Sequence, residues 1–139
     1  MRTEKLMAKS MTGNVSRLLL ALFFVVAGVL HFVFTPNYVK IMPPWLPWHL
    51  ALVVVSGLCE IAGGLGVLWH RARRWAGYGL IALSVAVLPA NVQMLLDAQA
   101  AGASAPWLAE LWARLPLQLV LVWWIWRATR PDGASASNG

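Results

Sequence analysis

The segment Leu50–Trp69, LALVVVSGLCEIAGGLGVLW, carries an apolar side chain at almost every position. Glu60 is its one charged residue. An α-helix needs about 20 predominantly apolar residues to cross a bilayer, and this segment has that length. In lipid, backbone N–H and C=O groups must bond to each other within the segment, which a helix achieves and an isolated strand does not. The segment therefore predicts a membrane-spanning helix.

Three other segments share this length and composition. They are Arg17–Phe34, Trp75–Leu96 and Trp107–Trp126. The most apolar part of the last one, Leu117–Trp126, is too short to cross alone. Its helix must therefore continue through Pro116, where we expect a kink. The predicted fold is an all-α membrane protein, a four-transmembrane-helix bundle.

The composition agrees with one membrane domain. The chain of 139 residues is 60% hydrophobic and 12% charged, whereas soluble domains are about 25% charged. We expect a basic N-terminal segment (1–16), the transmembrane domain (17–126) and a disordered cytoplasmic tail (127–139) that has nothing apolar to bury. The net charge of +6 would suit nucleic acid, but the basic residues form short clusters beside the apolar runs. This pattern excludes nucleic acid and makes the lipid bilayer the first partner.

Lys and Arg are divided unequally between the two sides of the predicted membrane, and this bias sets the orientation. One side receives only Lys40 and Arg114. We therefore expect both chain ends to be cytoplasmic (N-in/C-in), in a multi-pass protein of the bacterial cytoplasmic (inner) membrane. The other basic residues all fall on the cytoplasmic side: Arg2, Lys5, Lys9, Arg17, Arg71, Arg73, Arg74, Arg127 and Arg130.

Strongly polar side chains inside the spans are the candidate functional residues. A charge at the bilayer centre costs at least about 2.5–3.5 kcal/mol, so such residues usually face a partner, water or a site. At a rise of 1.5 Å per residue, all of them lie between the midplane and the extracytoplasmic face. Their shared depth predicts one outward-facing pocket, with no metal site and with no catalytic residue assigned. Its expected lining is His31, Glu60, Asn91, Arg114 and Gln118, while Gln93 shares their depth.

Glu60 is expected to pair with Arg114, the one cation placed to neutralise it. Glu110 competes for that arginine, because it stands four residues earlier on the same helix. Gly57 and Gly64 share a helix face with Glu60, so another helix can approach the carboxylate closely. A purely structural ion pair remains an alternative, as do plain helix–helix hydrogen bonds by His31, Asn91 and Gln93.

The connection at residues 35–48 is rich in proline and tryptophan. Pro43, Pro44 and Pro47 are expected to keep it extended, since each X-Pro step disfavours helix. Trp45 and Trp48 would hold it in the interface over the mouth of the bundle. We expect this segment to act as a lid.

Five short motifs follow one another along the chain: AGVLHF at 27–32, MPPWLP at 42–47, SG with EI and GG within 56–64, PAN at 89–91 and RLPLQ at 114–118. In this order and spacing they resemble the DoxX-like membrane proteins of bacteria, over about residues 15–130. The resemblance implies a four-helix membrane protein. The family is named for a small subunit of a respiratory or sulfur-oxidising quinone-linked complex, and other members are redox-associated. A quinone is thus the implied ligand, and a redox or respiratory subunit the implied partner.

Three functions remain open. The first is a small non-enzymatic subunit or binding protein whose pocket holds a lipid-soluble ligand. The second is a component of a quinone-linked oxidoreductase in which Glu60 and His31 relay protons. The chain has a single cysteine and no electron carrier of its own, which favours a binding protein over an enzyme. The third is a small-solute transporter, for which four helices would have to form a homo-oligomer.

Overall fold

The computed structural model describes residues 1–131, and over these residues the chain is all-α. Four helices are long and apolar enough to span a membrane. The predicted four-transmembrane-helix bundle is thereby confirmed, and a short helix, α2, lies between its first two spans. The bounds are α1 Arg2–Val33, α2 Thr35–Lys40, α3 His49–Leu68, α4 Arg73–Ala100 and α5 Ala105–Thr129.

The helices extend beyond the apolar segments that predicted them. α1 begins at Arg2, so the basic N-terminal segment and the first span form one continuous helix. The fourth span continues as a helix through Pro116, as its length requires. α5 ends at Thr129, so the first three residues of the predicted tail are helical. Residues 132–139 of that tail lie outside the described residues.

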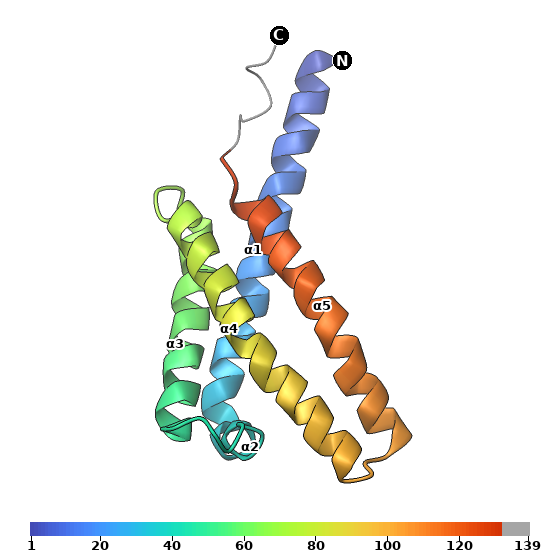
Figure 1. The fold of residues 1–139 in the computed structure, drawn as a ribbon. Helices are drawn as coiled ribbons and strands as arrows, with labels where there is room; N and C mark the ends of the chain where they lie inside the picture. The colour runs from blue at the N-terminus through green and yellow to red at the C-terminus, as the bar shows by residue number, and fades with distance from the viewer. Residues whose placement is uncertain (132–139) are drawn as a thin grey trace.

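The long helices run alternately up and down, which gives the bundle two chemically different ends (Figure 1). We call them the basic end, with the turn at residues 69–72 and the last turn of α5, and the α2 end, with α2 and residues 101–104. The start of α1 and the end of α5 lie on the side of the basic end. Which of these ends faces the cytoplasm stays a prediction from the distribution of Lys and Arg.

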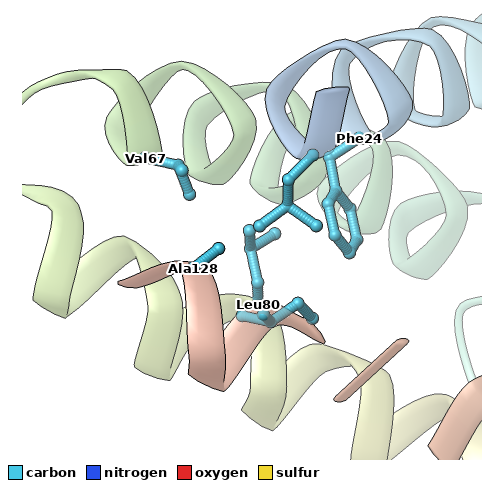
Figure 2. Close-up of a cluster of buried hydrophobic side chains, with 6 residues drawn as sticks. Phe24, Val67, Leu80 and Ala128 are labelled. Atoms are coloured by element: carbon cyan, nitrogen blue, oxygen red, sulfur yellow. The ribbon is translucent and has the colours of Figure 1, made fainter. Parts of the chain in front are cut away.

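Two apolar clusters hold the helices together. At the basic end, side chains from all four long helices meet, and Figure 2 shows Phe24 of α1, Val67 of α3 and Leu80 of α4 in this cluster. Near the α2 end, a second cluster is formed by α4 and α5 alone. The α4/α5 pair therefore joins α1 and α3 at the basic end and is held by its own contacts further out. The second cluster consists of Leu95, Ala98 and Leu111.

Glycine allows α1 and α3 to lie close together. A Cβ atom added to Gly57 would come 2.8 Å from the Cβ of His31, and one added to Gly64 would come 3.0 Å from a backbone oxygen of α1. These distances are shorter than ordinary van der Waals contacts, so larger residues do not fit without movement. The predicted small-residue face of α3 is thus its contact face with α1, and Glu60 lies on it.

Two arginines at the basic end bind the carboxyl-terminal carbonyls of helices. Arg17 is buried, and its Nε donates to the carbonyl oxygen of Ala128 in the last turn of α5, 3.0 Å away. Arg73 Nε donates to the carbonyl oxygen of Val67 in the last turn of α3, at 2.9 Å. These carbonyls lack donors within their helices and carry the negative end of the helix dipole, so a guanidinium suits them. Besides adding positive charge at this end, Arg17 therefore ties α1 to α5.

Candidate functional site

Toward the α2 end, the α4/α5 pair separates from α1 and α3 (Figure 1). A cavity of about 470 Å³ lies between the two apolar clusters. Side chains from all five helices line it. Gln93 is not among them, and its Nε2 donates to Asp97 Oδ1 on the same helix in an exposed hydrogen bond of 2.8 Å. The structure places all five residues of the predicted pocket in the lining: His31, Glu60, Asn91, Arg114 and Gln118.

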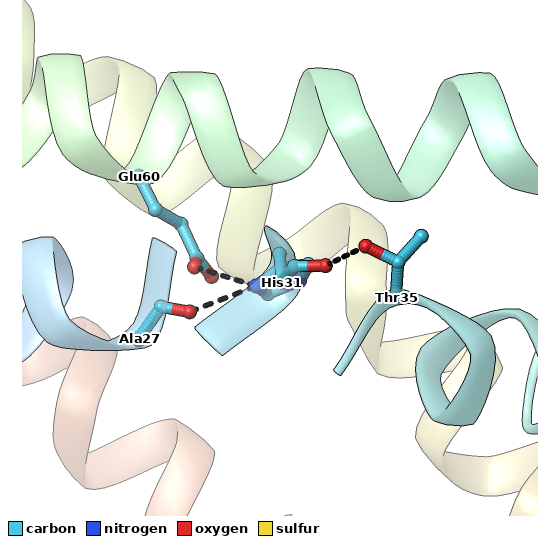
Figure 3. Close-up of polar contacts among 4 residues, drawn as sticks. All are labelled: Ala27, His31, Thr35 and Glu60. Carbon is cyan, nitrogen blue, oxygen red and sulfur yellow. Dashed lines mark hydrogen bonds and ion pairs between the residues drawn. The ribbon is translucent and has the colours of Figure 1, made fainter. Parts of the chain in front are cut away.

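His31 and Glu60 face each other where α1 and α3 touch (Figure 3). His31 Nδ1 lies 3.2 Å from Glu60 Oε2 and 2.9 Å from the carbonyl oxygen of Ala27. Because a carbonyl oxygen can only accept, Nδ1 carries a hydrogen and donates it to Ala27. In the neutral ring the other nitrogen, Nε2, then carries no hydrogen and is an acceptor.

Glu60 Oε2 is, among the described residues, the one buried side-chain oxygen or nitrogen without a hydrogen-bond donor. The His31 ring lies within ion-pair distance, but its hydrogen is directed to Ala27. A buried polar atom left without a partner costs about 1–3 kcal/mol. A proton on the carboxyl group or a donor on a bound ligand would remove this cost. No set of three His, Cys, Asp or Glu side chains in residues 1–131 is arranged to hold a metal ion.

The predicted pairing of Glu60 with Arg114 is wrong. Arg114 Nη2 lies 2.5 Å from Glu110 Oε1, one turn earlier on α5, and Glu60 pairs with His31 instead. An i,i+4 pair forms between neighbours on one helix surface, whereas Glu60 lies on the face of α3 that contacts α1. Arg114 still lines the cavity, with its guanidinium carbon 5.7 Å from the ring centroid of Trp107.

Asn91 and Gln118 connect α4 to α5 along the cavity wall. Asn91 Nδ2 donates to Gln118 Oε1 at 2.6 Å, and Gln118 Nε2 donates to the carbonyl oxygen of Ser84. Both amides thus hold the helices together, which is the structural alternative that the sequence left open for Asn91. Each of these bonds uses only one of the two N–H donors of its amide group, so both residues keep one N–H that can donate to a ligand.

Tyr38 of α2 also lines the cavity and was not predicted as a site residue. Its ring stacks on His31, with centroids 4.2 Å apart and an interplanar angle of 22°. Burial, followed by the charge of Glu60, raises the pKa of Tyr38 above its usual value of 10.0, and Arg114 lowers it in part. Its hydroxyl therefore stays protonated at neutral pH and can donate. Residues seven apart on one continuous helix lie about 10 Å from each other, so this stacking depends on the break between α1 and α2 and had no signal in the sequence.

The segment between α1 and α3 is more compact than predicted. Thr35–Lys40 form α2, with Pro36 at its start, where the missing N–H removes no helix bond. Pro43 is fully buried, and its carbonyl oxygen accepts from the Leu46 backbone N–H at 3.1 Å. The same oxygen lies 2.9 Å from the ring nitrogen Nε2 of His49. The prediction of an extended loop, made from its prolines, is therefore wrong. Of this segment, α2 is the part that borders the cavity, beside His31 and Glu60.

Toward the basic end the cavity is apolar, with Phe24, Leu121 and Trp124 in its lining. Three lining residues on α1 and α5 are also exposed on the surface of the bundle: Phe23 (48% exposed), Leu117 (62%) and Val120 (58%). The cavity thus opens sideways toward lipid, between α1 and α5, within the spanning part. The predicted opening toward the extracytoplasmic water stays a prediction.

Residues 20–129 match the family model described as "Domain of unknown function (DUF8561)". The chain belongs to this family. The match contains every residue that lines the cavity, from Phe23 to Trp124. No curated protein and no solved structure matches the chain. Since the family description names no activity, the function has to be argued from the cavity.

Proposed function

We propose that this protein is a small, non-enzymatic membrane subunit or binding protein whose cavity holds a lipid-soluble ligand with a small polar head. The observation that carries the proposal is the division of the cavity, which is polar at the α2 end, apolar toward the basic end and open to lipid between them. A quinone combines an oxygen-bearing ring with an apolar tail. The resemblance to DoxX-like proteins supports it as the candidate ligand.

The groups that the protein leaves unbonded indicate the chemistry of the polar head. The Tyr38 hydroxyl and the remaining N–H groups of Arg114 can donate to carbonyl oxygens. Glu60 Oε2 can accept from a hydroxyl group. A head with two oxygens, each of which is a carbonyl or a hydroxyl, would satisfy both kinds of group.

Binding can be tested on the purified full chain with decylubiquinone as the probe. Quinones quench tryptophan fluorescence at short range, so a quinone in the cavity should quench Trp124, which lines it. We expect saturable quenching that is reduced in Trp124→Phe. Tyr38→Phe keeps the ring and removes the hydroxyl, and loss of one hydrogen bond should weaken binding about two- to tenfold.

Tyr78→Phe is the matched control, since Tyr78 is the other tyrosine of the chain and does not line this cavity. Its affinity for the quinone should equal that of the unaltered protein. Quenching that rises linearly without saturation, or that weakens equally in both variants, would contradict the proposal. Native mass spectrometry of protein extracted from membranes would then identify any ligand that co-purifies.

A component of a quinone-linked oxidoreductase is the second candidate, because His31 and Glu60 lie 3.2 Å apart beside the cavity. Reduction of a quinone to a quinol takes two electrons and two protons. In this case the two residues would pass the protons, and a partner subunit would supply the electrons. Glu60→Gln should then bind decylubiquinone normally while quinone reduction in partner-containing membranes is lost. If binding and reduction fall together, Glu60 acts in binding only.

A further inference from the structure

A second cavity, of about 200 Å³, lies at the basic end between the start of α4 and the end of α5. It shares no lining residue with the first cavity. Arg74 of α4 and Arg130, the residue after α5, both line it, so the two cations come from opposite ends of the α4/α5 pair in sequence. Its volume is several times the roughly 30 Å³ that one water occupies in the liquid.

Aromatic rings position both guanidinium groups. Arg74 Nε donates to the Tyr78 hydroxyl at 3.2 Å, and its guanidinium carbon lies 5.8 Å from the centroid of that ring. The guanidinium carbon of Arg130 lies 4.0 Å from the ring centroid of Trp126. Stacking of this kind restricts a flexible side chain in advance and leaves most of its five N–H donors available. The two arginines are therefore preorganised for an anion.

No acidic side chain of residues 1–131 lines this cavity. Glu60 and Glu110 have other basic partners, His31 and Arg114. An anion with two or more acceptor oxygens suits this site, because guanidinium groups bind such oxygens in pairs. The two guanidinium groups of the lining repel a positively charged ligand group.

The cavity lies at the ends of two spanning helices, which is the depth of the lipid head groups. Arg74 stands at the first turn of one span and Arg130 just past the last turn of another. Trp75, Tyr78 and Trp126 are exposed at the same level, as aromatic residues are at a membrane–water interface. Basic pockets between spanning helices at this depth are suited to phospholipid head groups. The neighbouring surface of α4 and α5 is apolar and can accompany the acyl chains.

We propose that this cavity binds the phosphate group of an anionic phospholipid between Arg74 and Arg130. Two guanidinium groups, in a lining that contains no carboxylate among residues 1–131, favour a head group of net negative charge, such as phosphatidylglycerol, over a zwitterionic one. The lipid would bridge α4 and α5 at the basic end, where Thr129 closes the wall of the cavity. This site is independent of the ligand proposed for the first cavity.

Native mass spectrometry of the full chain in detergent, titrated with dioleoyl phosphatidylglycerol or dioleoyl phosphatidylcholine, tests the proposal. We expect tighter binding of phosphatidylglycerol and a loss of about fivefold in affinity for each of Arg74→Gln and Arg130→Gln. Arg74→Lys and Arg130→Lys keep the charge without the planar fork and should lose less. These lysine variants also keep the test valid if a glutamine variant does not fold.

Arg127→Gln is the matched control, because Arg127 lies three residues before Arg130 with its guanidinium carbon 5.3 Å from the Trp123 ring centroid, outside the cavity. Its affinity for phosphatidylglycerol should stay within about twofold of the original. An equal loss in this control would mean diffuse attraction and would overturn the site. Equal binding of both lipids would overturn its charge selectivity. Displacement of the lipid by millimolar inorganic phosphate would assign the site to free phosphate instead.

Discussion

Gly28 of α1 and Gly57 of α3 meet so closely that a Cβ atom on Gly28 would lie 2.6 Å from the carbonyl oxygen of Gly57. No contact of this kind exists between real side chains and backbone, so the two helices can adopt this separation only with glycine at both positions. The same contact holds His31 beside Glu60. The polar end of the cavity therefore depends on two residues that have no side chain.

Gly57→Ala should destabilise the protein by about 1–3 kcal/mol, because the added methyl group forces α1 and α3 apart. The separation should also weaken decylubiquinone binding. Thermal unfolding in mild detergent measures the first effect. Gly79→Ala is the control, since nothing lies within 4 Å of a Cβ there, and it should leave stability unchanged or slightly raised. Equal melting temperatures for the two variants would show that the glycine contact is unimportant.

The pairing of Glu60 can be decided with two double-mutant cycles. His31→Gln and Glu60→Gln should couple by about 0.5–3 kcal/mol, since the two groups touch. Arg114→Gln and Glu60→Gln should be additive to within about 0.5 kcal/mol, because Arg114 pairs with Glu110. Free energies of unfolding from detergent titrations supply the values. A larger coupling in the second cycle would restore the pairing that the sequence predicted.

Tyr38 should ionise only at alkaline pH. Its pKa is raised above 10.0 by burial first and by Glu60 second. A raised pKa in the folded state means that the unfolded chain loses the proton first. The stability linked to this group is therefore complete below pH 10.0 and falls as the pH rises through the folded-state pKa. Tyrosinate absorbance, taken as the difference between the unaltered protein and Tyr38→Phe, follows the ionisation. Glu60→Gln should move the midpoint to lower pH, and an unchanged midpoint would mean that the two groups do not interact.

Much of the fold could be predicted because it follows from chain length and side-chain chemistry alone. In lipid, each apolar segment has to be a helix so that its backbone N–H and C=O groups are hydrogen-bonded. Together with the length needed to span the membrane, this requirement predicted that the fourth span continues as a helix through Pro116. The shared depth of His31, Glu60 and Arg114 was also readable, because helical rise converts sequence position into depth. These properties depend on each helix separately.

What depends on how the helices face one another could not be predicted. The choice of Glu60 between His31 and Arg114 is set by the rotation of α3 against α1, which sequence position does not encode. The short helix that brings Tyr38 to His31 was missed because the prolines after it suggested an extended chain. Likewise, the buried Arg17 looked like a topology signal, and only the arrangement of α1 beside α5 reveals its carbonyl partner.

The orientation of the chain in the membrane is open to a direct test. In a Cys59→Ala background, Ser104→Cys would place one thiol at the α2 end and His70→Cys one at the basic end, and both positions are exposed. We expect a membrane-impermeant maleimide to label position 104 in intact cells and position 70 only after permeabilisation. The reverse pattern would put the basic end outside and contradict the N-in/C-in prediction.

For the ligand proposed above, the side opening between α1 and α5 would make the bilayer the reservoir from which it is drawn. Transfer of an apolar molecule from water into lipid is favourable by about 0.8 kcal/mol for each CH₂ group. Such a molecule can therefore be scarce in water and abundant in the lipid beside the protein. Occupancy then follows the mole fraction of the ligand among the lipids and not its molarity in the medium. A modest intrinsic affinity would suffice in a cell, and dilution into micelles would empty the site even though no contact with the protein had changed.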